Sequence, residues 1–170
     1  VDHLADHPSN SHLIIQARRD VLAATPSRLR GVTVIVPVYS GLKATKRCLN
    51  SVLCSVSTQP FRLLVIYDAG PDPRVEKYLE DLAENNSIEL VKNDTNKGFV
   101  KTVNRGFELA GEDDVVILNS DTEVAAGWID RIVALADTDP KIATVTPLTN
   151  NGEIASFPNL CSDNHLPAGF

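Results

Sequence analysis

Apolar residues recur along this chain in two alternating patterns from Gly31 onward. Runs of consecutive branched aliphatic residues predict strands buried on both faces of a sheet, and apolar residues three or four positions apart predict one-sided helices. The predicted strands cover residues 32–37, 61–66, 88–91, 115–118 and 142–145, and the predicted helices cover residues 42–56, 73–85, 98–110 and 127–136. Strands separated by helices of this length predict an α/β fold with a mainly parallel sheet and helices on both of its faces.

The same spacing predicts the inward face of each helix. The side chains expected in the core are Leu42, Thr45, Leu49, Val52, Leu53 and Val56 in the first helix, Val75, Tyr78, Leu79 and Leu82 in the second, Val100, Val103, Phe107 and Ala110 in the third, and Trp128, Ile129, Ile132 and Leu135 in the fourth.

The chain divides into three parts by composition. Residues 1–30 are polar, contain His3, His7 and His12, and are interpreted as a lead-in or linker whose histidines are solvated. Residues 31–150 carry the alternating pattern and form the predicted core, and residues 151–170 form a tail without clear periodicity. The chain starts with Val and contains no Met, which indicates a processed chain or a piece of a longer one.

Charge and composition narrow the classes of function. A formal net charge of -6 argues against a nucleic-acid partner, because phosphate backbones are held by clustered Lys and Arg. No stretch approaches the roughly 20 apolar residues that cross a bilayer, so we expect no transmembrane segment. Cys48, Cys54 and Cys161 lack the spacing of a zinc site or a disulfide scaffold, so we expect reduced thiols and a cytoplasmic location.

Polar residues follow three of the predicted strands, in residues 37–40, 67–72 and 119–121. Because parallel strands end at the same edge of a sheet, we expect one shared crevice there, with Asp68 and Asp121 facing it. The predicted helix from Gly98 onward also begins at this edge, where its first amides could approach a phosphate.

Two familiar nucleotide-binding classes are disfavoured. The first predicted strand is not followed by a Gly-x-Gly-x-x-Gly fingerprint, and no Gly-Lys-Ser/Thr loop occurs, so dehydrogenases of the Rossmann type and P-loop enzymes do not fit. Taken alone, the Asn119-Ser120-Asp121 segment fits a helix cap as well as a metal site.

Four short motifs occur in order along the chain. They are Val34-Ile35-Val36-Pro37-Val38-Tyr39, then Leu64-Val65-Ile66-Tyr67-Asp68-Ala69-Gly70-Pro71-Asp72, then Asn96-Lys97-Gly98-Phe99 with Asn104-Arg105-Gly106, and finally Leu118-Asn119-Ser120-Asp121-Thr122. In this order they resemble the family 2 glycosyltransferases of the GT-A fold, over about residues 32–151.

The resemblance implies a nucleotide-diphospho-sugar donor and a saccharide or lipid-linked acceptor, with inversion at the transferred sugar. Asp121 would bind a Mg²⁺ or Mn²⁺ ion that bridges the two phosphates, with Asn119 as a neutral ligand at most. The residues that the resemblance implies for donor binding are Pro37, Val38, Tyr39, Asp68, Lys97, Gly98, Asn119 and Ser120.

Two positions depart from the family pattern. Tyr67-Asp68 stands where many relatives have an acidic pair or Asp-Asn, and Asn119-Ser120-Asp121 stands where many have Asp-x-Asp. The second change removes one formal charge, so weaker metal binding is expected. The resemblance also places the general base beyond Phe170, in an acceptor-side half, so the chain is interpreted as a partial domain without an assigned base.

The segments Thr146-Pro147-Leu148-Thr149-Asn150-Asn151 and Ala155-Ser156-Phe157-Pro158 resemble a bacterial subgroup of rhamnosyltransferase-like enzymes. This resemblance implies surface polysaccharide assembly, at the inner face of the membrane. Two alternatives remain open at this stage: a non-catalytic nucleotide-sugar-binding module, and a flavodoxin-like signalling domain with Mg²⁺ at its acidic strand ends.

Overall fold

The computed structural model describes residues 31–151 and 155–164, which form two compact units that divide between Trp128 and Ile129. The lead-in predicted for residues 1–30, including His3, His7 and His12, lies outside the described residues, as does the end of the predicted tail. In the described part of the chain, no helix combines the length and the apolar character needed to cross a membrane.

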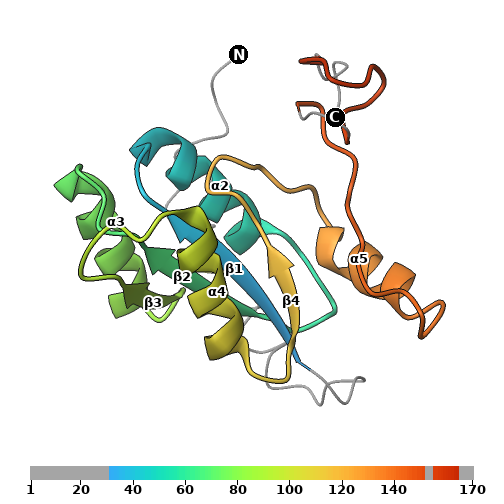
Figure 1. Cartoon of the computed structure of the whole chain (residues 1–170), viewed down its shortest axis with the longest axis horizontal. Coiled ribbons are helices and arrows are strands. Elements are labelled where there is room, and N and C mark those ends of the chain that lie inside the picture. Colours follow the sequence, from blue (N-terminus) through green and yellow to red (C-terminus); the bar gives the residue numbers. More distant parts are fainter. Residues whose placement is uncertain (1–30, 152–154, 165–170) are drawn as a thin grey trace. The chain divides into compact units, whose positions relative to one another are not determined.

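The first unit is built on a parallel sheet of four strands (Figure 1). The strands are β1 (Val32–Val38), β2 (Arg62–Tyr67), β3 (Glu89–Lys92) and β4 (Asp114–Ile117), and their order in the sheet is β3-β2-β1-β4. Val38 pairs with Tyr67, and Ile35 pairs with both Leu64 and Ile117. The predicted α/β fold with a parallel sheet is therefore confirmed, with β1 longer by one residue and the bounds of β2, β3 and β4 shifted by one residue.

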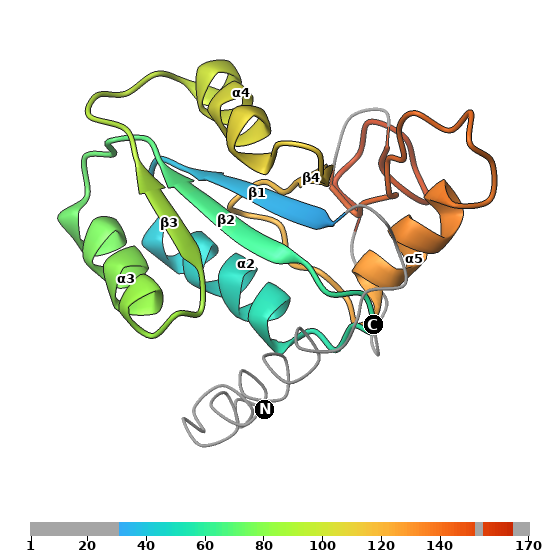
Figure 2. The same cartoon turned by 90° about the horizontal axis from the view of Figure 1, so that it is seen from below.

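Helices cover both faces of this sheet, as predicted. Figure 2 shows α4 (Phe99–Ala110) on one face, and α2 (Leu42–Cys54) and α3 (Pro73–Glu84) on the other. Between the sheet and α4 lies a fully buried cluster of Ile35, Leu64 and Ile66, against which Val91 and Val115 pack. Burial of these branched side chains stabilises the sheet and fixes α4 over its centre.

Local chemistry explains where α2 and α3 begin. Gly41, directly before α2, has a φ of 87°, a conformation that costs glycine little. The Asp72 side chain accepts a hydrogen bond from the Arg74 amide at 3.0 Å and so caps the start of α3, whose first residue is Pro73.

The predicted burial of β4 is wrong. It was expected to be buried on both faces, yet Val115 and Val116 are only half-buried and Ile117 is 44% exposed. The reason is its place in the sheet: among the described residues β4 pairs with β1 alone, so it is an edge strand.

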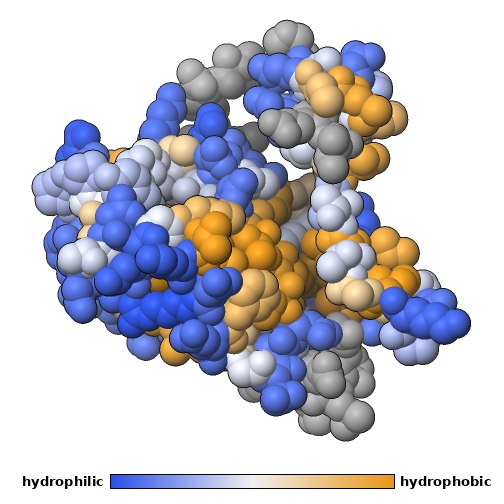
Figure 3. Space-filling model, in the orientation of Figure 1, coloured by the Kyte–Doolittle hydropathy of each residue, from blue (hydrophilic) through white to orange (hydrophobic). Residues whose placement is uncertain are grey.

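In the first unit, three predicted core residues of the helices are exposed instead. Val56 lies beyond the end of α2 at Cys54 and is 74% exposed. Val100 and Phe107 are 68% and 46% exposed, because α4 turns Thr102, Val103, Gly106 and Ala110 toward the sheet. Figure 3 shows the resulting apolar surface over α4 and β4.

The second unit contains most of α5 (Trp128–Ala136) and the segments that follow it. In α5 the predicted Ile129 is buried, Leu135 is 51% exposed, and Val133 is buried although it was not predicted. The strand predicted for residues 142–145 is wrong, since those residues form no regular element. A strand needs a paired neighbour, and the described part of this unit contains only isolated bridges, Thr149 to Ser156 and Asn151 to Asp163.

Candidate functional site

A cavity of about 560 Å³ lies at the carboxyl ends of the strands in the first unit. The chain proceeds from β1 outward through β2 to β3 and then returns to the other side of β1 with β4, so the strand order reverses between β1 and β4. The cavity is lined from the ends of both of these strands, and in open α/β sheets such a reversal point is where ligands bind.

The cavity brings together eight of the nine predicted site residues. They are Pro37, Val38, Tyr39, Asp68, Gly98, Asn119, Ser120 and Asp121. The ninth, Lys97, lines a separate hollow of about 480 Å³ with Lys101, Asn104 and Arg105 on the outer side of α4.

Six further residues line the cavity without having been predicted: Ser40, Gly41, Ala44, Asn96, Phe99 and Thr102. Asn96 and Phe99 stand inside the motif that contains Gly98, and Ser40 and Gly41 directly follow the first strand end, so both signals were present in the sequence. Thr102 and Ala44 needed the folded helices, because only packing shows which helical side chains reach the cavity.

The wall between β1 and β2 depends on a close backbone approach. A Cβ atom on Gly70 would lie 1.6 Å from the carbonyl oxygen of Tyr39, so only glycine fits at this position. The buried Tyr67 donates a hydrogen bond from its hydroxyl to the Gly70 carbonyl at 2.8 Å. Tyr67 therefore supports the wall from behind and is not a cavity-lining residue.

Asp68 is the buried carboxylate of the cavity wall, 4% exposed. Its Oδ1 accepts hydrogen bonds from Asn93 Nδ2 at 2.6 Å and from the Lys97 amide at 2.8 Å, and its Oδ2 accepts one from the Gly98 amide at 2.9 Å. Burial alone would raise the pKa of this carboxyl, but the hydrogen bonds from Lys97, Asn93, Thr102 and Gly98 outweigh it and hold the pKa below 3.8. Asp68 is therefore ionised at neutral pH.

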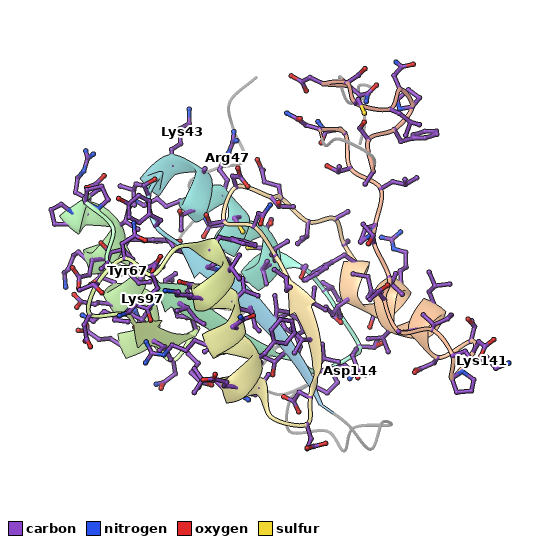
Figure 4. All side chains as sticks on the ribbon, in the orientation of Figure 1. Lys43, Arg47, Tyr67, Lys97, Asp114 and Lys141 are labelled. Carbon is purple, nitrogen blue, oxygen red and sulfur yellow. The ribbon has the colours of Figure 1, made fainter. Side chains whose placement is uncertain are left out.

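The loop after β4 is held in place by α2. Cys48 donates a hydrogen bond from Sγ to the Asn119 carbonyl at 3.4 Å, and Ser51 Oγ accepts one from the Val124 amide at 3.0 Å. Arg47, which projects from α2 on the same side as Lys43 (Figure 4), forms an exposed ion pair with Glu123 at 3.0 Å. These contacts fix the backbone that presents the Asn119 to Asp121 segment to the cavity.

Cys48 is a structural thiol and not a nucleophile. It is fully buried, and burial, with the nearby negative charges of Asp121 and Glu123, raises its pKa to about 12. Among the described residues, Cys48, Cys54 and Cys161 form no disulfide bond.

The predicted metal residue, Asp121, is exposed at the cavity and has polar neighbours. The described residues contain no group of three or more His, Cys, Asp or Glu side chains that could hold a metal ion by themselves. One carboxylate with the Asn119 amide and the Ser120 hydroxyl nevertheless fits Mg²⁺ or Mn²⁺, which are commonly held by one or two carboxylates and by the phosphates of a ligand. The donor set thus suits a cation that is completed by a bound diphosphate.

Comparisons with known proteins give relatives for most of the chain. A family model described as Glycosyl transferase family 2 matches residues 33–160. A dolichol-phosphate mannosyltransferase of Pyrococcus furiosus is 21% identical over 127 residues, which are 75% of this chain and 36% of the relative. A poly-beta-1,6-N-acetyl-D-glucosamine synthase of Staphylococcus aureus is 26% identical over 118 residues, which are 69% of this chain and 28% of the relative. The chain therefore spans about a third of the length of these curated relatives.

A solved structure shares the fold. A mannosyltransferase from Pyrobaculum calidifontis, in complex with GDP-Man and Mn2+, matches with a TM-score of 0.59 at 19% identity, over 83% of this chain and 44% of that chain. At this identity the similarity establishes the fold, and it confirms the predicted partial GT-A domain.

Proposed function

The chain belongs to glycosyl transferase family 2, and from that premise we propose that residues 31–150 bind a nucleotide-diphospho-sugar and transfer its sugar to an acceptor hydroxyl with inversion. The observation that carries the proposal is the cavity where β1 and β4 end, which gathers the polar strand ends of three strands. A structural relative binds GDP-Man and Mn2+, which supports a donor of this class.

We assign the nucleotide to the wall formed by Pro37, Val38, Tyr39 and the turn at Asp68, and the diphosphate to the Asn119 to Asp121 side. Ser120 and Asn119 would supply neutral hydrogen bonds to phosphate oxygens. Asp121 would be the carboxylate ligand of Mg²⁺ or Mn²⁺. When bound, such a cation offsets the negative charge that grows on the departing diphosphate.

In the proposed reaction the acceptor oxygen forms a bond to the anomeric carbon on the side opposite the diphosphate. The bond from that carbon to the diphosphate oxygen breaks with its electron pair, and the hydroxyl proton passes to a base. Asp68 and Asp121 are the carboxylates that line the described cavity, and neither suits this base, since Asp68 is hydrogen-bonded by the protein and Asp121 belongs to the metal. The base therefore remains unassigned within these residues.

A saccharide or a lipid-linked acceptor fits the relatives, one a dolichol-phosphate mannosyltransferase and one a polysaccharide synthase. We propose a role in cell-surface polysaccharide synthesis, in the cytoplasm at the inner face of the membrane. Among the described residues, no carboxylate other than Asp68 and Asp121 lines the cavity, which favours a second candidate, a module that binds the donor without turning it over.

Calorimetric titration with UDP-, dTDP- and GDP-sugars, with and without Mn²⁺, tests the proposal. We expect binding of at least one donor class that is strengthened by Mn²⁺. Absence of binding to every donor at millimolar concentration would refute donor binding by this chain, whereas binding without hydrolysis or transfer would support the binding module.

A further inference from the structure

The carboxylate of Asp68 faces the protein. Its two oxygens accept hydrogen bonds from the Asn93 side chain and from the backbone amides of Lys97 and Gly98, each at 2.9 Å or less. Together with the Thr102 hydroxyl, which also hydrogen-bonds Asp68, these donors account for the roughly four lone-pair positions of a carboxylate. A ligand in the cavity would meet a side chain that is 4% exposed and already hydrogen-bonded.

The partners of Asp68 form a buried polar network at the ends of two strands and the start of a helix. Asn93 is 7% exposed and follows β3, and Thr102 is 1% exposed and lies in the first turn of α4. Asn93 Nδ2 also donates to Thr102 Oγ1 at 3.1 Å, while Arg105 holds the Asn93 side-chain oxygen from outside. Each member constrains the next, so the network has one well-defined arrangement.

The segment tied down by this network is exposed. Residues 94–98 lie at the surface between β3 and α4, and the Lys97 and Gly98 amides are the groups by which Asp68 anchors them. Two residues of this exposed segment, Asn96 and Gly98, line the cavity, and Phe99 follows them in its wall. The position of the cavity wall formed by Asn96, Gly98 and Phe99 thus depends on hydrogen bonds to the buried carboxylate of Asp68.

We propose that Asp68 is a positioning residue, which holds residues 94–98 in the form that binds the donor and does not itself contact the nucleotide. The inference rests on the proposed donor binding and assigns a different task to a residue expected to hold the base. If only a fraction of molecules has the loop in place, the apparent dissociation constant of every donor rises by the inverse of that fraction. A loop that is correctly placed in about a tenth of molecules weakens all nucleotides about tenfold.

Asp68→Asn is the first test, because it keeps the shape of the side chain but replaces one carboxylate oxygen by an NH2 group. This group is a donor and cannot accept a hydrogen bond from a backbone amide. We expect amide hydrogen exchange of residues 94–98 in the unliganded protein to accelerate about tenfold, while the amides of β1 and β2 stay protected. Dissociation constants for UDP and GDP, measured with Mn²⁺, should rise by the inverse of the fraction of molecules in which the loop is in place. This factor is the same for both nucleotides, so the ratio of their dissociation constants stays unchanged.

Asp72→Asn is the matched control, because Asp72 precedes α3 without lining the cavity and its hydrogen bonds are made to Arg74. This variant should leave nucleotide affinity and the exchange of residues 94–98 unchanged. A comparable loss in the control would attribute the effect of Asp68 to the turn as a whole and overturn the proposal.

Lys97→Pro tests the same idea without altering Asp68. Proline removes the amide that donates to Oδ1, and Lys97→Ala controls for the lost side chain. The loop-holding role predicts faster amide hydrogen exchange in residues 94–98 and weaker UDP and GDP binding in Lys97→Pro than in Lys97→Ala. A direct contact between Asp68 and the nucleotide base predicts no such loss, because the carboxylate has one fewer protein partner in Lys97→Pro. Equal affinity in the two lysine variants, or a changed UDP to GDP ratio with normal loop exchange in Asp68→Asn, would contradict it.

The two proposals fail in different ways. A wild-type chain that binds neither nucleotide refutes donor binding and with it the functional half of this inference. Unchanged loop exchange in Asp68→Asn, in a chain that binds UDP or GDP, refutes the loop-holding role alone.

Discussion

Asp121 lies at the exposed end of the loop after β4, where its side chain can be changed without disturbing the core. Asp121→Asn should leave the unfolding transition in place and abolish the part of nucleotide binding that depends on Mn²⁺, because a neutral amide is a weak metal ligand. Titration of the variant with UDP and GDP, with and without Mn²⁺, measures this. A Mn²⁺ effect equal to that of the wild type would remove Asp121 from the metal site.

Glu108→Gln is the control for that variant. Glu108 is another exposed carboxylate, but it lies on α4 and lines the hollow outside this helix. The variant removes one negative charge, as Asp121→Asn does, so a general electrostatic effect on nucleotide binding should appear in it as well. We expect the Mn²⁺ dependence of Glu108→Gln to match that of the wild type.

Asp68 should also affect how the free energy of unfolding changes at acid pH. Its pKa in the folded protein lies below 3.8, so the folded state takes up the proton less readily than the unfolded chain does. The ionised carboxylate therefore stabilises the fold above about pH 4, and this contribution is lost as the pH falls through the lower folded pKa. Urea denaturation of wild type and Asp68→Asn should show a difference in free energy of unfolding that is largest near pH 7 and shrinks below about pH 4. A difference that is constant with pH would show that the carboxylate charge is not what stabilises.

At the scale of elements, the packing of α4 on the sheet depends on Gly106. A Cβ atom at this position would lie 2.7 Å from two carbons of the fully buried Ile35. Alanine favours a helix over glycine by about 1 kcal/mol, but the overlap with Ile35 should outweigh this and destabilise the protein by about 1–2 kcal/mol. Urea denaturation of Gly106→Ala measures the net effect.

Ile35→Val provides the rescue for that prediction, because it removes one of the two overlapping carbons. Ile35→Val should lower the free energy of unfolding less in the Gly106→Ala background than in the wild type. In that background the shorter side chain relieves the overlap with the new Cβ atom and leaves a smaller cavity. Asn104→Ala, on the exposed side of the same helix, should be nearly neutral. If the losses in free energy of unfolding of the two single variants simply add in the double variant, the strain in Gly106→Ala does not come from the contact with Ile35.

The existence and order of the elements could be predicted from the sequence because each depends on local periodicity. The spacing of Thr45, Leu49 and Val52 identifies the buried face of α2 without reference to any other element. The inward faces of α4 and α5 were predicted less well, with Phe107 and Leu135 exposed. A helix spacing shows which residues share a face, but only the neighbouring elements decide how much of that face is covered.

At the scale of the whole molecule, the cavity residues all precede the division between Trp128 and Ile129. Within this first unit Trp128 packs edge-on against Phe61 at 6.2 Å and donates to Ser55 Oγ at 3.3 Å. A chain of residues 31–128 should therefore unfold cooperatively and bind the same nucleotides with unchanged affinity. Circular dichroism during urea denaturation and calorimetric titration test this, and loss of cooperative unfolding would show that the second unit is needed for the fold.

Most of the residues that line the cavity could be predicted from the sequence, since strand ends of a parallel sheet meet at one edge. Pro37, Asp68 and Asn119 come from segments far apart in the chain and line one cavity. Lys97 is the exception, and the reason is local: its amide points to Asp68 while its side chain lines the hollow outside α4. Sequence order gives no information on which side of the backbone a loop side chain lies.

By itself the sequence determined the alternation of strands and helices, the parallel sheet and the family, because periodicity and short motifs are properties of local order. The tertiary structure decided the tasks of individual side chains. It made β4 an edge strand of the sheet formed by the described residues, it placed Tyr67 behind the cavity wall, and it surrounded Asp68 with amides and Asn93. These outcomes depend on contacts between residues that are far apart in the sequence. Whether a carboxylate hydrogen-bonds a ligand or a loop of its own protein depends on which donors the fold brings within reach.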